Sequence, residues 1–91
     1  MRISYDPAKR DRTLAGRGLD FNDAVEVFDG IVVEVQDTRR DYGEPRIVCF
    51  GFLRRRLVQI VYTPRGAVRH IISMRKANDR EKARLAPLLG L

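Results

Sequence analysis

Residues 57–78 read Leu-Val-Gln-Ile-Val-Tyr-Thr-Pro-Arg-Gly-Ala-Val-Arg-His-Ile-Ile-Ser-Met-Arg-Lys-Ala-Asn. Two apolar runs rich in β-branched residues flank a Pro-Arg-Gly segment in this stretch, a pattern that predicts a β-hairpin. Pro64 and Gly66 stand where a type I turn over residues 63–66 favours proline and glycine. We expect the rest of the chain to pack around this hairpin.

The second arm of the hairpin carries the most informative side chains. Because alternate residues of a strand share a face, unbroken alternation sorts this arm into two sets. One set is Arg69, Ile71, Ser73 and Arg75, and the other is Val68, His70, Ile72 and Met74. Arginines at strand spacing, with Arg65 beside them in the turn, predict a phosphate-binding surface, because a guanidinium matches two phosphate oxygens. The alternative is a solvated outer face without a ligand.

Helix and strand signals place the other elements. Asp6-Pro7 begins a helix over residues 7–15, and Asp20 caps a second helix over residues 21–28 that has an apolar stripe. Further strands are expected at residues 2–5, 31–36 and 46–53, a polar loop at 37–45, and a capped helix at 79–86. The order β-α-α-β-β-β-β-α predicts an α+β fold, an antiparallel sheet packed against N-terminal helices on one face.

The composition is that of one small basic domain spanning residues 1–91. Lysine and arginine number 18 against 12 acidic residues, a net charge of +6, which favours nucleic acid or an acidic protein as the partner. With one histidine and one cysteine, Cys49 in an apolar run, we expect a core cysteine and no metal or cofactor. No apolar run reaches the roughly 18 residues that span a bilayer, so we expect a cytoplasmic protein without a membrane partner.

Short motifs spread in order along the chain resemble the BrnT toxins of type II toxin–antitoxin systems. They are Tyr5-Asp6-Pro7-Ala8-Lys9, Gly18-Leu19-Asp20-Phe21, Val27-Phe28-Asp29, Tyr42-Gly43-Glu44, Val61-Tyr62-Thr63-Pro64-Arg65-Gly66 and Ile71-Ile72-Ser73-Met74-Arg75-Lys76-Ala77, with single matches at Ala24, Asp37, Arg39, Arg46, Gly51, Arg69 and Glu81. No single motif is specific, whereas the ordered set, which covers nearly the whole chain, is.

The resemblance implies a RelE-like fold and a ribonuclease toxin that acts on RNA, on or off the ribosome, and blocks translation. It also implies a BrnA-like antitoxin with a ribbon-helix-helix domain, and operator DNA that is bound only through the toxin–antitoxin complex. The chain departs from the family in the first helix, where Asn-x-x-Lys-His-Gly is usual and Thr13, Gly16, Arg17 and Gly18 stand here. Leu85 replaces a frequent tyrosine in the last helix. Chemistry that needs the missing histidine or tyrosine would be weakened here or would use other groups.

RNA cleavage without a metal uses the substrate's own 2′-OH as nucleophile, so the protein must hold the phosphate and move protons. Arginine can hold the phosphate but cannot act as a base. That leaves Glu44, His70, Tyr62 or solvent as proton carriers. We predict Arg69, Arg75 and Glu44 as catalytic residues, and Arg46, Arg65, Ser73 and Lys76 as RNA- and phosphate-binding residues.

Each proton carrier has a structural alternative. Glu44 can simply pair with a neighbouring arginine. Strand alternation favours a buried or edge position for His70 and a core position for Tyr62. A non-catalytic basic module that binds nucleic acid or an acidic protein fits the composition equally well, although no helix-turn-helix or zinc finger is visible. A third possibility is a small α+β domain whose charge serves only solubility.

Overall fold

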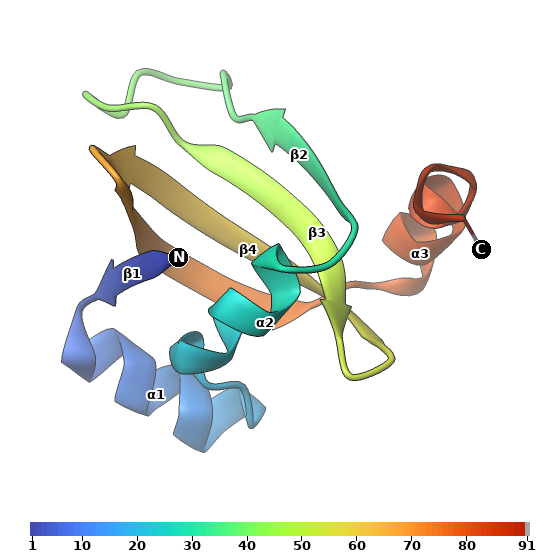
Figure 1. Cartoon of the computed structure of the whole chain (residues 1–91), viewed down its shortest axis with the longest axis horizontal. Helices are drawn as coiled ribbons and strands as arrows, with labels where there is room; N and C mark the ends of the chain where they lie inside the picture. Colours follow the sequence, from blue (N-terminus) through green and yellow to red (C-terminus); the bar gives the residue numbers. More distant parts are fainter. Residues whose placement is uncertain (91) are drawn as a thin grey trace.

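Five strands form one sheet, with helices on both of its faces (Figure 1). The computed structural model describes residues 1–90. In chain order the elements are β1 (Arg2–Tyr5), α1 (Pro7–Arg17), the 3₁₀ helix η1 (Phe21–Asp23), α2 (Ala24–Phe28), β2 (Val32–Gln36), β3 (Ile47–Leu53), β4 (Arg56–Arg65), β5 (Val68–Lys76), α3 (Asp79–Leu85) and the 3₁₀ helix η2 (Ala86–Leu89). The predicted α+β class and element order are confirmed. None of the helices in residues 1–90 is long and apolar enough to cross a membrane.

The strands lie in the order β1-β5-β4-β3-β2. From β2 to β5 each strand pairs antiparallel with the next, as predicted, whereas β1 pairs with β5 in parallel. The sheet is therefore mixed and not antiparallel throughout. Because β1 and β2 lie at opposite edges, α1, η1 and α2 carry the chain from one edge of the sheet to the other (Figure 1).

We call the side of the sheet under this crossover the helical face. Its core joins Phe21, Ala24, Val27 and Phe28 of the crossover to Cys49, Val58, Ile60, Tyr62, Ile71 and Met74 of the sheet. Phe21, Ala24 and Phe28 of the stripe predicted for residues 21–28 are buried, whereas Val25, its fourth predicted member, is half-buried and Val27 is buried instead. The core positions predicted for Cys49 and Tyr62 are confirmed. By contrast α1 buries none of its residues, in agreement with its polar sequence.

The opposite side, which we call the open face, is covered at one end only. There Leu85 and Leu89, from α3 and η2, pack against Phe50 and Leu57 of the sheet. The N-terminal helices pack on one face as predicted, whereas the C-terminal segment after Asn78 folds back and places Leu85 and Leu89 on this second face. Leu88 remains 65% exposed, and Leu91 lies outside the described residues.

A β-bulge in β5 decides which side chains reach the open face. Val61 pairs with Ser73, but the next residue, Tyr62, pairs with Ile71, so Ile72 is an extra residue in β5. Strand alternation reverses at such an insertion. Ser73 and Arg75 therefore lie on the open face, whereas Arg69 lies on the helical face. The prediction that these three side chains share a face is wrong for this reason.

Two tight turns join the last three strands. Arg65 still pairs with Val68, so the hairpin turns through Gly66 (φ 60°) and Ala67 rather than through the predicted residues 63–66. A positive φ at the first central position is typical of two-residue hairpin loops. Between β3 and β4 the two central residues are Arg54 and Arg55, with φ of 52° and 83°.

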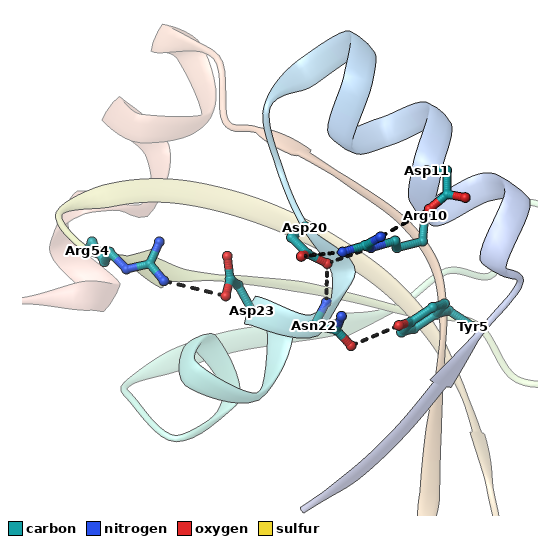
Figure 2. Close-up of polar contacts among 7 residues, drawn as sticks. All are labelled: Tyr5, Arg10, Asp11, Asp20, Asn22, Asp23 and Arg54. Carbon is teal, nitrogen blue, oxygen red and sulfur yellow. Dashed lines mark hydrogen bonds and ion pairs between the residues drawn. The ribbon is translucent and has the colours of Figure 1, made fainter.

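Ion pairs and hydrogen bonds fix the N-terminal segment against the start of the crossover (Figure 2). Arg10 donates two hydrogen bonds to the Asp20 carboxylate, at 3.0 and 2.8 Å. These hydrogen bonds from Arg10 are the main cause that lowers the pKa of Asp20. Tyr5 donates to Asn22 at 2.9 Å. These contacts brace α1 and the end of β1 (Figure 2), which keeps β1 alongside β5.

Candidate functional site

Arg75 lies on the open face where β5 leads into α3. Its Nη1 and Nη2 atoms bind the Glu81 carboxylate at 2.8 and 2.9 Å. Glu81 closes the predicted capping box by accepting a hydrogen bond from the Asn78 backbone N–H at 3.0 Å. The Arg75 guanidinium is the main cause that lowers the pKa of Glu81 to about 2, so this carboxylate is charged at neutral pH.

A groove of about 700 Å³ runs beside this pair, between the sheet and α3. Val33, Val48 and Phe50 are among the apolar residues that line it, and Arg75 and Arg84 add positive charge. Val35 and Leu88 also line the groove and are 59% and 65% exposed. An apolar surface next to fixed cations suits a ligand with a flat or apolar part and an anionic part.

Three of the predicted site residues meet at the other end of the open face. Arg65 forms an ion pair with Glu44 at 3.3 Å, so the pairing expected as an alternative for Glu44 is confirmed. The Arg46 guanidinium lies 3.9 Å from the centre of the Tyr42 ring. Cation–π contacts of this kind hold an arginine in one orientation without neutralising its charge.

The loop that carries Glu44 and Tyr42 is braced from within. The Asp37 carboxylate accepts two hydrogen bonds from the Arg39 guanidinium, both at 2.9 Å, and another from the Tyr42 hydroxyl at 2.9 Å. Hydrogen bonding with Arg39 holds the pKa of Asp37 well below its usual range. The long loop therefore presents Glu44 and Arg46 from a fixed base.

His70 shares the open face with these groups. Its Nδ1 atom lies 2.8 Å from Ser4 Oγ across the β1–β5 pairing. On its other side His70 pairs with Thr63, which is fully buried. The sequence pattern singles out neither Ser4 nor Thr63 as a neighbour of His70, because the parallel pairing of β1 with β5 and the bulge at Ile72 are set by the whole sheet.

Arg69 lies apart from these groups, on the helical face. Its guanidinium carbon is 4.5 Å from the centre of the Phe28 ring and 5.2 Å from that of the Tyr62 ring. The Tyr62 hydroxyl in turn donates to Glu34, and burial together with this carboxylate raises the pKa of Tyr62. Arg69 is thus packed among aromatic rings and does not share a surface with Arg75.

Two further predicted residues lie towards the edges of the sheet. Lys76 is exposed and pairs with Val58, so alternation turns it away from Arg75. Ser73 borders a hollow of about 390 Å³ between β5 and α1, which Thr13, Gly16 and Arg17 also line. The departures from the BrnT pattern in the first helix therefore meet at one place. Arg17 Nη1 there donates to the Met74 carbonyl oxygen at 2.8 Å.

Cys49 is fully buried on the helical face, and burial raises its pKa to about 12. The thiol is therefore protonated at neutral pH and is not an activated nucleophile. Among residues 1–90 no three or more His, Cys, Asp or Glu side chains gather into a group that could hold a metal ion.

The fold and the open face define a small basic α+β protein with arginines held in fixed positions on one face of its sheet. The family model described as "Ribonuclease toxin, BrnT, of type II toxin-antitoxin system" matches residues 5–81. The chain belongs to this family of ribonuclease toxins, which confirms the resemblance seen in its motifs. No curated protein matches the chain.

Proposed function

We propose that this toxin is an endoribonuclease that cuts RNA on the open face of its sheet without a metal ion. One observation carries this location. The bulge at Ile72 and the fixed loop bring five of the seven predicted site residues to the open face or its rim, namely Glu44, Arg46, Arg65, Ser73 and Arg75. Family membership supports ribonuclease activity, and the arginines supply the phosphate contacts that such chemistry requires.

The two arginine sites are suitably spaced for a single strand of RNA. Arg65 pairs with Val68, which stands seven positions before Arg75 in β5, one of them the bulge residue, so the two arginine sites are separated by about 23 Å at most along the strand. A strand that follows β5 would meet Arg75 at one end and Arg65 with Arg46 at the other. Binding through phosphates in this manner tolerates many sequences.

Arg75 is the residue we assign to a phosphate at one end of the bound strand. Three of the five guanidinium N–H donors are used within the protein, two by Glu81 and one by the Lys76 carbonyl oxygen. The Nε–H and the second Nη2–H remain, and these two point in nearly the same direction. A phosphate can accept both, so that Glu81 fixes the guanidinium while its other edge holds the RNA. The scissile phosphate would lie at the other end of the open face, where Arg65 supplies positive charge and the Glu44 carboxylate paired with it can accept a proton.

We further propose that a BrnA-like antitoxin neutralises the toxin, that the free toxin inhibits translation, and that the complex of the two represses their operon. Membership of a type II toxin family supports an antitoxin partner. The groove beside Arg75 supplies an apolar surface, with Val35 and Leu88 exposed, on which such a partner would cover the arginine.

Cleavage of RNA by the purified chain in the presence of a chelator tests the activity and its independence from metal ions. Arg75→Gln should lower kcat/KM by about tenfold or more, because it removes a charge-assisted contact to a phosphate. Arg80→Gln, on the exposed side of α3, is the matched control and should cleave as the parent does.

RNA binding without cleavage would support the non-catalytic basic module instead. Growth arrest on expression, relieved by the antitoxin, tests the toxin in cells.

A further inference from the structure

We propose that His70 is the general base of the cleavage and that Ser4 positions its ring. This inference rests on the proposed ribonuclease activity and adds to it a proton carrier. It follows from the bulge at Ile72, which places His70 on the open face among the phosphate-binding arginines instead of against the helices. His70 is the only histidine of the chain.

His70 lies in a row of polar residues that crosses the open face. Ser4 of β1 pairs with it on one side and Thr63 of β4 on the other. Arg46 immediately precedes Ile47, the partner of Tyr62, and so comes level with Thr63. The row therefore runs from a hydroxyl through an imidazole and a second hydroxyl to a guanidinium.

Two polar atoms of this row are buried and form no hydrogen bond within residues 1–90, namely Thr63 Oγ1 and Arg46 Nε. Thr63 has none of its surface exposed. Buried donors of this kind nearly always have a partner, so two neighbours without one point to a polar ligand. Because neither atom is exposed, the phosphate contact beside His70 falls to Arg65, whose side chain is 50% exposed and whose charge acts on the ring. A phosphodiester held by Arg65 would bring the adjoining ribose to His70.

The contact with Ser4 determines which nitrogen of His70 is available. Ser4 Oγ lies 2.8 Å from Nδ1. When Nδ1–H donates to this oxygen, the lone pair is on Nε2, and no side chain of residues 1–90 forms a hydrogen bond with Nε2. Fixing the tautomer through the other ring nitrogen is how a base is held ready in hydrolytic sites.

Burial and the charges around the ring together keep His70 neutral at neutral pH. Burial is the largest cause that lowers the pKa of His70 below its ordinary value of 6.5. The positive charge of Arg65 and, more weakly, that of Lys9 lower it further, whereas the carboxylates of Glu44 and Asp6 act in the opposite direction. A neutral imidazole at neutral pH is the form that accepts a proton.

The step balances without a metal or cofactor. Nε2 of His70 takes the proton of the ribose 2′-OH as the 2′-oxygen forms a bond to the adjacent phosphorus. The bond from phosphorus to the 5′-oxygen of the next nucleotide breaks, and that oxygen takes a proton from water. The products are a 2′,3′-cyclic phosphate and a 5′-hydroxyl, and His70 returns to its neutral form by releasing its proton to solvent.

The decisive experiment is the pH profile of kcat/KM on an RNA fragment that the parent chain cuts. The parent should lose activity about tenfold per pH unit below the pKa of His70, because the base becomes protonated. His70→Gln, which keeps a polar side chain, should be slower by about 10²-fold or more and should lack this acidic limb. A parent profile that shows no acidic limb at any pH at which the chain stays folded would overturn the proposal even if no His70 variant folded.

Ser4 is tested by a pair of variants. Ser4→Ala should lower kcat, by less than His70→Gln does, and leave KM unchanged, because the ring loses its orientation and not the substrate contacts. Ser4→Thr keeps the hydroxyl and suits a strand, so it should restore kcat. Ser4→Ala and Ser4→Thr losing kcat equally, at equal melting temperature, would remove the positioning role.

The outcomes separate this inference from the proposed function. If the parent cuts RNA and His70→Gln cuts it equally well, the ribonuclease stands and His70 is only a link between β1 and β5. If the parent does not cut RNA, the proposed function itself fails. Arg80→Gln, which lies outside the site, should retain both the parent rate and its acidic limb.

Discussion

Arg75 and Glu81 face each other through two parallel hydrogen bonds of 2.8 and 2.9 Å, which tie the last strand to the last helix. Glu81 also accepts from the Asn78 backbone N–H, so one carboxylate caps α3 and holds the arginine. Its side chain is only 11% exposed, so this ion pair is screened less than one at the surface. The same pair therefore supports both the junction of β5 with α3 and the assigned phosphate contact.

Glu81→Gln should destabilise the protein by about 2 kcal/mol, the order of a charge-assisted hydrogen bond. Glutamine can still close the capping box, so the loss reports the missing charge opposite Arg75. Thermal melting should show it as a fall of about 8–16 °C, at roughly 4–8 °C per kcal/mol. Asp79→Asn, on the exposed first turn of α3, is the control. An equal loss of stability in this variant would mean that Glu81 acts only through its negative charge near the N-terminus of α3 and not through Arg75.

The same pair predicts a loss of stability in acid. The pKa of Glu81 is lowered to about 2 from an ordinary value of 4.5, so its contribution is fully present above pH 4.5. This contribution is lost as the pH falls from about 4.5 to about 2, where the folded protein must also bind the proton. Asp20 and Asp37 add to the acid sensitivity of the parent, because their pKa values are lowered too. The difference in unfolding free energy between the parent and Glu81→Gln isolates Glu81, and a difference that is constant with pH would contradict the assignment.

Arg69 and Arg75 should separate in function because they lie on opposite faces of the sheet. Arg69→Met keeps the length of the side chain but loses its cation–π contacts with Phe28 and Tyr62, at a cost of about 1 kcal/mol. We expect a lower melting temperature and, per folded molecule, a much smaller loss of RNA cleavage than Arg75→Gln causes. A loss as large as that of Arg75→Gln, in a folded protein, would return Arg69 to the catalytic group.

Local chemistry in the sequence predicts much of this fold. The caps at Asp6, Asp20 and Asn78 begin helices where expected, and the β-branched runs form the strands. What the sequence does not show is the bulge at Ile72, because one extra residue in an apolar strand leaves composition and length unchanged. That single insertion moves Arg69 off the open face and brings His70 onto it.

The candidate site was predictable in its residue types more than in its partners. Glu44 pairs with an arginine, as the alternative interpretation expected, and the partner is Arg65 of β4, which lies 21 residues further along the chain. The pairing of Arg75 with Glu81 and of His70 with Ser4 depends on tertiary contacts, between β5 and α3 and between β5 and β1. Contacts between elements distant in the chain are set by the packing of the whole sheet, so no local sequence pattern predicts them.

The turn between β3 and β4 offers a stabilising change. Arg54 and Arg55 both have positive φ, a conformation that costs a non-glycine residue about 1 kcal/mol or more. Arg55→Gly should therefore stabilise the protein by about 1 kcal/mol, because the second central residue of such a turn favours glycine. Arg56→Gly, one residue later and already in β4, is the matched control and should destabilise by about 0.5–1 kcal/mol. Chemical denaturation of the three proteins measures both, and an unfavourable effect of Arg55→Gly would show that its side chain matters more than its backbone.

RNA binding should weaken with salt in proportion to the phosphates that the open face neutralises. For a single strand, the slope of log affinity against log salt is about −0.7 per phosphate. Arg65→Gln and Arg46→Gln should each make this slope shallower by about 0.7, because each removes one phosphate contact and no base contact. Arg80→Gln changes the net charge by the same amount away from the open face, so it controls for the overall field of the protein. Measurement under conditions that prevent cleavage, with a substrate lacking the 2′-OH, keeps binding separate from chemistry. Slopes for Arg65→Gln and Arg46→Gln that match the slope for Arg80→Gln would mean that the RNA lies elsewhere on the protein.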